Sequence, residues 1–404
     1  MADDFLLYNG RVLAETQTLP HGYVLSRAGR VASIGAEWTS QEAWRDGAVV
    51  KIDVDGLSIC PGLIDMHTHG IMDVSFMEDD GPAMVRGLSA YARYGVTRLL
   101  ATTLANPYDA IITQARRVAA AMEDATYGAM LHGVHMEGPW LAARCRGGHD
   151  LRYLREPEPR DVERVLGEAG NVIRTVTFAP ELPGSIWLTE QLAYRGIVPI
   201  LGHTEATWEQ ARAAILAGAR HVTHLYDATL GYKENPGEAL VMMPGMETAA
   251  LYDDNVSIEL IGCPVHVPEP FFSFIDKVKP AGKKIVVTDS LVGAGQPEGT
   301  VISFRDGHKV YVEKGVLRMI DEDPKINGNL TGSAITLNVA LRRLQEYAGL
   351  LLPEAIRWVS LNPAMTLGID HETGSLRVGK LSDIAVLDEQ CNARMTFVKG
   401  KRVF

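Results

Sequence analysis

Short apolar runs alternate with amphipathic segments through the middle of the chain. The amphipathic segments carry apolar side chains at helical spacing, as at Ile111, Ile112, Ala115 and Val118. Several of them end at a glycine that leads into the next run, as in ARYGVTRLL and PAGKKIVVTD. This alternation is typical of a parallel sheet with helical crossovers. It predicts eight strands, the number of a closed barrel, at residues 59–66, 96–102, 129–135, 172–179, 197–202, 220–224, 255–260 and 284–289.

Both ends of the chain follow a different pattern, in which short β-type stretches are separated by glycine turns. FLLYNGRVL and GYVLSRAGRVASIG show it near the start, and GSLRVGKLSDIAVL shows it near the end. We therefore expect residues 1–58 and 370–404 to form one small β-sandwich domain from both termini. Residues 59–369 are expected to form a (β/α)8 barrel of the TIM type, so the fold class is α/β.

Residues 291–330 interrupt the barrel pattern. The stretch VISFRDGHKVYVEKGVLRM predicts a β-hairpin or meander with turns at Asp306-Gly307 and Lys314-Gly315. It follows the eighth strand, so it is expected to form a lid or wall at the face where barrel active sites lie. Helices are predicted after it, at 332–347 and 353–366.

Composition narrows the possible partners. The 404 residues are 46% hydrophobic and 22% charged, which is enough for a large core. The net charge of −11 and pI near 5.6 argue against nucleic-acid binding, because phosphate backbones require clustered lysine and arginine. The four cysteines form no C-x-x-C pair, and no apolar stretch approaches ~18 residues. We expect a cytoplasmic protein with no membrane segment that acts on a small molecule.

Five of the apolar runs lead into side chains that can bind a metal. A parallel barrel brings the carboxyl ends of its strands to one face, so these side chains should converge there. Neutral imidazoles and carboxylates without thiolates suit a divalent ion such as zinc or iron. Enough of them are present for one or two ions. The candidates are His67, His69, Glu137, His203, His224 and Asp289.

A metal site of this kind predicts hydrolysis. A divalent ion lowers the pKa of water from ~15.7 towards ~7 and polarises a carbonyl oxygen, so an amide carbon becomes open to attack. Asp289 is the candidate general base that passes a proton to the leaving nitrogen. Asp65 lies on the same side of the first strand as His67 and His69, and we expect it to orient one of these rings. The remaining candidates are expected to be structural: His21, His132, His221, His308 and His371.

The motifs around these residues resemble those of the amidohydrolase superfamily, and within it the N-acetylglucosamine-6-phosphate deacetylase family. The matching stretches are PGLIDMHTHG, HMEGPWL, RGGHD, GHTEAT, THLYDA, VTDS and NLTGS, and the resemblance covers essentially the whole chain. It implies a metal-dependent enzyme that removes the acetyl group of an N-acetylhexosamine 6-phosphate such as N-acetylglucosamine 6-phosphate. It also implies a homodimer. The implied metal ligands are Glu137, His203 and His224 for the principal ion and His67 and His69 for a second ion, with Asp289 acting as base and then acid.

The resemblance also implies a set of substrate contacts. These are His149, Asp227, Ala228, Glu234, His266, Leu330, Thr331 and Gly332. Simpler interpretations are a loop histidine at 149, a strand-end histidine at 266 and a helix cap at Thr331 or Ser333.

Two positions depart from the family pattern. The family usually has Asn where this chain has Asp227, and Arg-Glu-Pro-Gly where it has residues 234–237. Carboxylates repel a phosphate dianion, so an unphosphorylated N-acetyl sugar, another N-acyl compound or a cyclic amide remains an alternative substrate. A sugar-binding barrel without catalytic activity is the alternative from another class.

Overall fold

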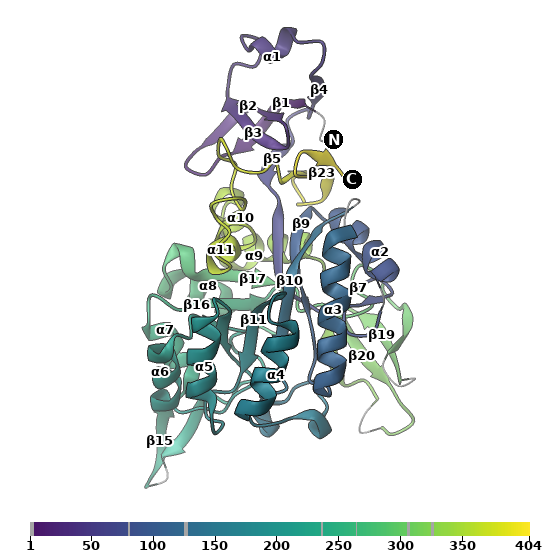
Figure 1. The fold of residues 1–404 in the computed structure, drawn as a ribbon. Coiled ribbons are helices and arrows are strands. Elements are labelled where there is room, and N and C mark those ends of the chain that lie inside the picture. Colours follow the sequence, from purple (N-terminus) through teal and green to yellow (C-terminus); the bar gives the residue numbers. More distant parts are fainter. Residues whose placement is uncertain are drawn as a thin grey trace.

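The computed structural model describes residues 4–79, 81–124, 128–235, 237–263, 265–304, 308–324 and 327–404. A sheet made from both ends of the chain stands on one end of a helix-covered barrel (Figure 1). The hairpin that contains β15 projects from the end of the barrel farthest from that sheet.

The barrel is an eight-stranded parallel sheet in the order β17-β16-β13-β12-β11-β10-β9-β6. Its first and last strands are joined beyond their ends, where Asp289 N donates to His67 O at 3.0 Å and His69 N donates to Ser290 O at 2.8 Å. The predicted (β/α)8 barrel is therefore confirmed. The strands are β6 (Leu63–Thr68), β9 (Val96–Thr102), β10 (Met130–Glu137), β11 (Ile173–Phe178), β12 (Val198–Leu201), β13 (His221–Val222), β16 (Ser257–Ile261) and β17 (Lys284–Val287).

Helices cover the outside of this sheet and connect its strands (Figure 1). The apolar faces of most of these helices pack on the strands in one large core, in which Phe178 and Phe272 are fully buried. α6 shows how the sequence begins and ends such a helix: Thr207 and Gln210 form a capping box, and Gly218 follows with φ 125°. The helices are α2 (Gly81–Ala92), α3 (Tyr108–Asp124), α4 (Pro159–Ala169), α5 (Ser185–Tyr194), α6 (Trp208–Ala217), α7 (Met246–Tyr252), α8 (Pro270–Val278), α9 (Leu337–Ala348), α10 (Leu352–Trp358) and α11 (Leu361–Thr366), with 3₁₀ turns η1 (Ala143–Cys145), η2 (Leu151–Tyr153) and η3 (Ala281–Lys283).

The terminal sheet has the order β24-β23-β22-β5-β1-β2-β3, with β4 paired to β1. One face packs around Phe5, Phe397 and Val386, and the other around Leu6 and Tyr23, with the short helix α1 (Glu42–Arg45) nearby. Both chain ends lie at this sheet (Figure 1). Its strands are β1 (Phe5–Leu13), β2 (Thr18–Arg27), β3 (Arg30–Gly35), β4 (Val50–Asp53), β5 (Ser58–Pro61), β22 (Ile384–Leu387), β23 (Ala393–Val398) and β24 (Lys401–Arg402).

The first barrel strand differs from its prediction. Residues 59–66 were expected to form one strand, but β5 pairs with β22 in the terminal sheet and only β6 belongs to the barrel. The chain passes between the two sheets at Gly62. A Cβ there would lie 2.2 Å from Thr97 Oγ1, so only glycine fits at the crossing.

A four-stranded antiparallel sheet follows the eighth barrel strand, as the meander pattern predicts. Lys314 and Gly315 form one of its turns, with φ 51° and 79°, whereas the predicted turn at 306–307 lies outside the described residues. The helix predicted from residue 332 begins only at Leu337, because the preceding residues pair with β20 as β21. Neither Thr331 nor Ser333 is therefore its cap. The strands are β18 (Val301–Phe304), β19 (His308–Glu313), β20 (Val316–Ile320) and β21 (Leu330–Ser333).

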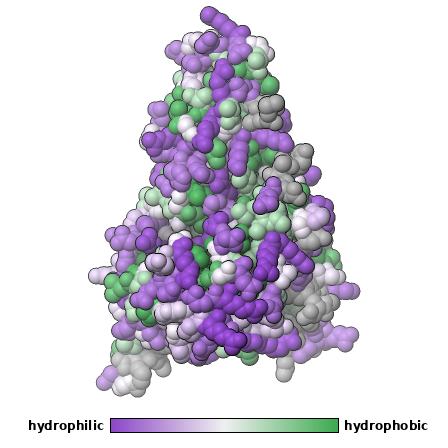
Figure 2. All heavy atoms as spheres, viewed as in Figure 1, coloured by the Kyte–Doolittle hydropathy of each residue, from purple (hydrophilic) through white to green (hydrophobic). Residues whose placement is uncertain are grey.

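Two small hairpins complete the described fold. One joins β7 (Gly70–Ile71) to β8 (Val74–Ser75), and the other joins β14 (Tyr232–Asn235) to β15 (Glu238–Pro244). The surface seen in Figure 2 is largely hydrophilic, with apolar residues in small groups. Among the described helices, none has the length and apolar character needed to cross a membrane.

Candidate metal centre

Candidate ligands lie at or just beyond the carboxyl ends of barrel strands. Glu137 is the last residue of β10. Just beyond three other strands the backbone turns sharply, with φ values of 48° at His203, 21° at His224 and 46° at Asp289. Such values are unfavourable for residues with a Cβ and persist only where the surrounding structure determines them. These turns direct the three side chains into the barrel mouth.

The Glu137 carboxylate lies at the centre of the group. Its Oε1 is 3.1 Å from Nε2 of His203 and 3.1 Å from Nε2 of His224. On the other side, Nε2 of His67 is 3.4 Å from Oε1 and Nε2 of His69 is 3.3 Å from Oε2. One carboxylate is thus shared by two pairs of imidazoles.

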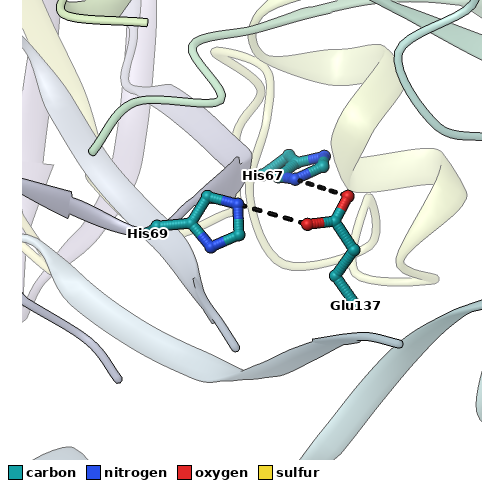
Figure 3. A group of neighbouring side chains, drawn as sticks. All are labelled: His67, His69 and Glu137. Carbon is teal, nitrogen blue, oxygen red and sulfur yellow. Dashed lines mark ion pairs between the residues drawn. The ribbon is translucent and has the colours of Figure 1, made fainter. Parts of the chain in front are cut away.

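The two pairs define two candidate ion sites. One consists of Glu137, His203 and His224, and within it the potential ligand atoms lie within 4.8 Å of one another. The other consists of Glu137, His67 and His69, and it meets the same limit. Figure 3 shows the second group, with both rings turned towards the carboxylate. All five side chains are buried.

The chemistry of the donor atoms fits a divalent metal. Among the described residues His67 Nε2 has no hydrogen-bond partner, although it is buried and lies 3.3 Å from Asp289 Oδ1. A buried ring nitrogen without a partner is costly, and a bound cation would satisfy it. Imidazole nitrogen with carboxylate oxygen is a donor set that zinc and iron accept.

Backbone carbonyls set the ring orientation of two candidate ligands, His203 and His224. His203 Nδ1 donates to Cys145 O at 2.7 Å, and His224 Nδ1 donates to Asp227 O at 3.2 Å. A proton on Nδ1 leaves the Nε2 lone pair directed at Glu137. Both rings therefore present the nitrogen that a metal requires.

Positive charge is strongly favoured inside this group. Burial opposes a charged His224, but Glu137 and then Asp289 outweigh it and raise the pKa of His224 to about 9. The same balance raises the pKa of His67 and of His69. Burial disfavours ionised Glu137, yet the surrounding histidines hold its pKa well below the usual range. The site is built to accept cationic charge, whether protons or a metal.

Asp289 lies beside the second group. Its Oδ1 is 3.1 Å from His69 Nε2 and 3.3 Å from His67 Nε2. Burial disfavours its charge, but His67 and His69 overcome this effect and lower the pKa of Asp289 to about 2. The side chain is 19% exposed. An ionised carboxylate open to the mouth has the properties of a general base.

His149 adds a neutral donor to the same group. Its Nε2 is 3.2 Å from Glu137 Oε2, and its Nδ1 accepts from Ala105 N at 3.0 Å. The bond from Ala105 places the ring proton on Nε2. Burial lowers the pKa of His149 to about 4, so the ring is neutral near pH 7.

A cavity beside the group contains most of the positions for which the resemblance implies sugar contacts. Leu330 is not among the described residues that line it; its side chain lies in β21 and is 42% exposed. The side chain of Glu234 in β14 lies outside the described residues. The implied contacts that line the cavity are His149, Asp227, Ala228, His266, Thr331 and Gly332.

Asp65, which was expected to orient the ring of His67 or His69, contacts neither ring by a hydrogen bond among the described residues. Asp65 Oδ2 instead accepts from Thr288 Oγ1 at 2.7 Å, which ties β6 to the end of β17. The ring of His67 is bound by Glu259 from β16, with Nδ1 2.6 Å from Oε1. Glu259 escaped the sequence analysis because it lies inside the apolar run SIELIG, whereas the candidate ligands were sought at or just after the ends of such runs. A single charged residue inside an apolar run was the signal in the sequence that could have identified Glu259.

Known proteins are similar to this chain in both architecture and sequence. The model of the amidohydrolase family matches residues 58–403. The chain is 31% identical to the N-acetylgalactosamine-6-phosphate deacetylase of Escherichia coli O157:H7 over 88% of this chain and 92% of that protein. It is 27% identical to the N-acetylglucosamine-6-phosphate deacetylase of Bacillus subtilis strain 168, over 100% of this chain and 98% of that one.

Solved structures agree with these sequence matches. The N-acetylglucosamine-6-phosphate deacetylase of Pasteurella multocida superposes with a TM-score of 0.86 at 26% identity, covering 99% of both chains. A parallel barrel with imidazoles and carboxylates at its strand ends defines a metal-dependent hydrolase. The chain belongs to the amidohydrolase family, and the resemblance seen in its motifs is confirmed.

Proposed function

We propose that this protein removes the acetyl group from an N-acetylhexosamine 6-phosphate, such as N-acetylglucosamine 6-phosphate, to give the amino sugar and acetate. The observation that carries the proposal is the Glu137 carboxylate between two imidazole pairs, with ionised Asp289 at its side. The named relatives are deacetylases of N-acetylgalactosamine 6-phosphate and N-acetylglucosamine 6-phosphate. The metal-binding groups and the neighbouring carboxylate of Asp289 suit the hydrolysis of an amide bond, such as that of an N-acetyl group.

The metal is proposed to be zinc or iron, with one or two ions bound. Glu137, His203 and His224 would hold the principal ion, and Glu137 with His67 and His69 would hold the second. A divalent ion in this site lowers the pKa of water and polarises an amide carbonyl.

Asp289 performs the proton transfers. Its carboxylate accepts the proton of the attacking water at an Oδ atom. The protonated side chain then delivers that proton to the amide nitrogen, because an amide anion is a poor leaving group. Its exposed fraction places it within reach of a substrate in the cavity.

His149 is proposed to orient the acetamido group. Its Nε2–H, fixed by the bond from Ala105 N to Nδ1, can donate to the carbonyl oxygen and to the negative charge that develops there. A neutral ring suits this role because it keeps its donor across the neutral pH range.

The sugar is proposed to lie against His266, Asp227, Ala228, Thr331 and Gly332. None of the described residues that line this cavity is a lysine or an arginine. A phosphate would therefore depend on His266, backbone groups or a second copy of the chain. Comparison of phosphorylated with unphosphorylated N-acetyl sugars decides how much the phosphate contributes.

The proposal is tested by measuring acetate release from the 6-phosphates of N-acetylglucosamine and N-acetylgalactosamine, and from both free sugars. We expect turnover of a phosphorylated sugar, loss of activity on chelation, and recovery with zinc or iron. Released ammonia instead of acetate would indicate a different amidohydrolase reaction. Absence of tightly bound metal and of any turnover would favour the non-catalytic sugar-binding barrel.

A homodimer is proposed from the hairpin β14–β15. On its second strand Leu240 is 90% exposed and Met242 is 64% exposed, and the hairpin projects from the barrel (Figure 1). Exposed neighbouring apolar side chains on one projection mark an interaction site. Light scattering should give twice the mass of the chain for the unmodified protein. The double variant Leu240→Asp, Met242→Asp should have the mass of a monomer.

A further inference from the structure

Glu259 lies one layer behind the candidate metal centre. Its carboxylate is 1% exposed in the middle of β16, and each oxygen has its own partners. Oε1 is 2.6 Å from His67 Nδ1, accepts from Thr223 Oγ1 at 2.6 Å and accepts from His224 N at 3.2 Å. Oε2 is 3.0 Å from His221 Nε2. One buried carboxylate thus contacts a ligand from each of the two candidate ion sites.

We infer that Glu259 is a positioning residue for the second ion site. It accepts the Nδ1 proton of His67 and so leaves the Nε2 lone pair facing Glu137 and Asp289. The inference rests on the proposed function, because it assigns Glu259 to the ion held by His67 and His69. Through the backbone of His224 it also links β6 to β13.

The arrangement of the two oxygens separates this role from simple core packing. Oε2 faces away from the metal-centre side and contacts His221, whose Nδ1 lies 2.9 Å from Ser257 Oγ. All the contacts given for Oε1 are with groups next to the candidate metal centre, and Thr223 Oγ1 is an additional donor there. A carboxylate behind an imidazole raises its basicity and fixes its tautomer.

Charge is part of the same role. The Glu259 carboxylate is surrounded by hydrogen-bonding groups: Thr223 Oγ1, the backbone N–H of His224, and ring nitrogens of His67 and His221. An ionised carboxylate adjacent to His67 adds negative charge next to the second ion site, where two divalent ions would share the single carboxylate of Glu137. Glutamine at 259 would keep the size and an acceptor oxygen but remove this charge.

The test is metal binding to the full-length protein, measured by competition with a chromophoric chelator and by elemental analysis. Glu259→Gln should weaken zinc binding at the His67 site by about 10- to 100-fold, so that roughly one of two ions is lost at limiting zinc. Glu259→Asp, which keeps the charge, should recover part of the affinity. In a His67→Asn background, Glu259→Gln should add little.

Asp383→Asn is the matched control, because Asp383 is also a buried carboxylate with several partners but lies in the terminal domain. It should lower stability without changing metal content. Unchanged affinity for both ions in Glu259→Gln, or equal loss of both, would overturn the inference. If that variant does not fold, Thr223→Val decides, with a smaller loss confined to one ion expected. None of these outcomes depends on deacetylation, which is tested separately on the unmodified enzyme.

Discussion

Raising the pH of the metal-free protein is expected to destabilise it through His224. The pKa of this buried ring is raised from 6.5 to about 9 by Glu137 and Asp289, which outweigh burial. A tenfold change in proton affinity is worth about 1.4 kcal/mol, so the bound proton contributes about 3 kcal/mol to stability. His67 and His69 shift in the same direction.

The sign of the effect follows from the raised pKa. The contribution is fully present below pH 6.5, where unfolded histidine is also protonated, and it is lost as the pH rises through about 9. The carboxylates of the site are already ionised in this window and add no change. With zinc bound, the ring nitrogen holds the metal instead of a proton, so this loss should disappear.

Urea unfolding in the presence of a chelator, compared with unfolding in zinc, measures this difference across the window. His224→Gln should reduce the pH slope of the metal-free protein, whereas His371→Gln, at an exposed histidine, should leave it intact. A flat pH profile in chelator would refute the reasoning. So would the same slope with and without zinc.

Three further changes test the site and the core. Asp289→Asn should lower kcat/KM by about 10²- to 10⁴-fold while elemental analysis still finds the principal ion; retained activity would exclude Asp289 as the base. Phe272→Ala should cost about 3–5 kcal/mol in urea unfolding, whereas Phe274→Ala on the same helix, 44% exposed, should cost less than ~0.5 kcal/mol. Thr207→Ala removes the acceptor for Gln210 N and should cost about 1 kcal/mol.

Most of the barrel could be predicted because its signals are local. Strands buried on both faces read as continuous apolar runs, and their helices carry a helical period with capping residues such as Thr207. The errors fall where a local pattern has two solutions. The run 59–66 is apolar apart from Asp65 and predicts one strand. Pro61-Gly62 is the local sign of a break in it, and the crossing itself depends on the contact between Gly62 and Thr97. The strand at 330–333 depends on pairing with β20.

The candidate metal centre was likewise predictable in part from the sequence. The candidate ligands follow apolar runs, so their residue types and strand positions predict convergence without coordinates. The ring orientations cannot be predicted in this manner. The link from His67 to Glu259 spans 192 residues, and Asp65, favoured by strand parity, turned out to bind Thr288.

The sequence by itself determined the fold class, the candidate ligands at the strand ends and the type of chemistry, because hydrophobic period, turn residues and donor atoms act over short stretches of chain. Only the tertiary structure decided that Glu137 stands between two imidazole pairs and that Glu259 lies behind His67. Distances between side chains on different strands depend on the register and closure of the whole barrel. Those distances determine which nitrogen carries a proton and which is free to bind a metal.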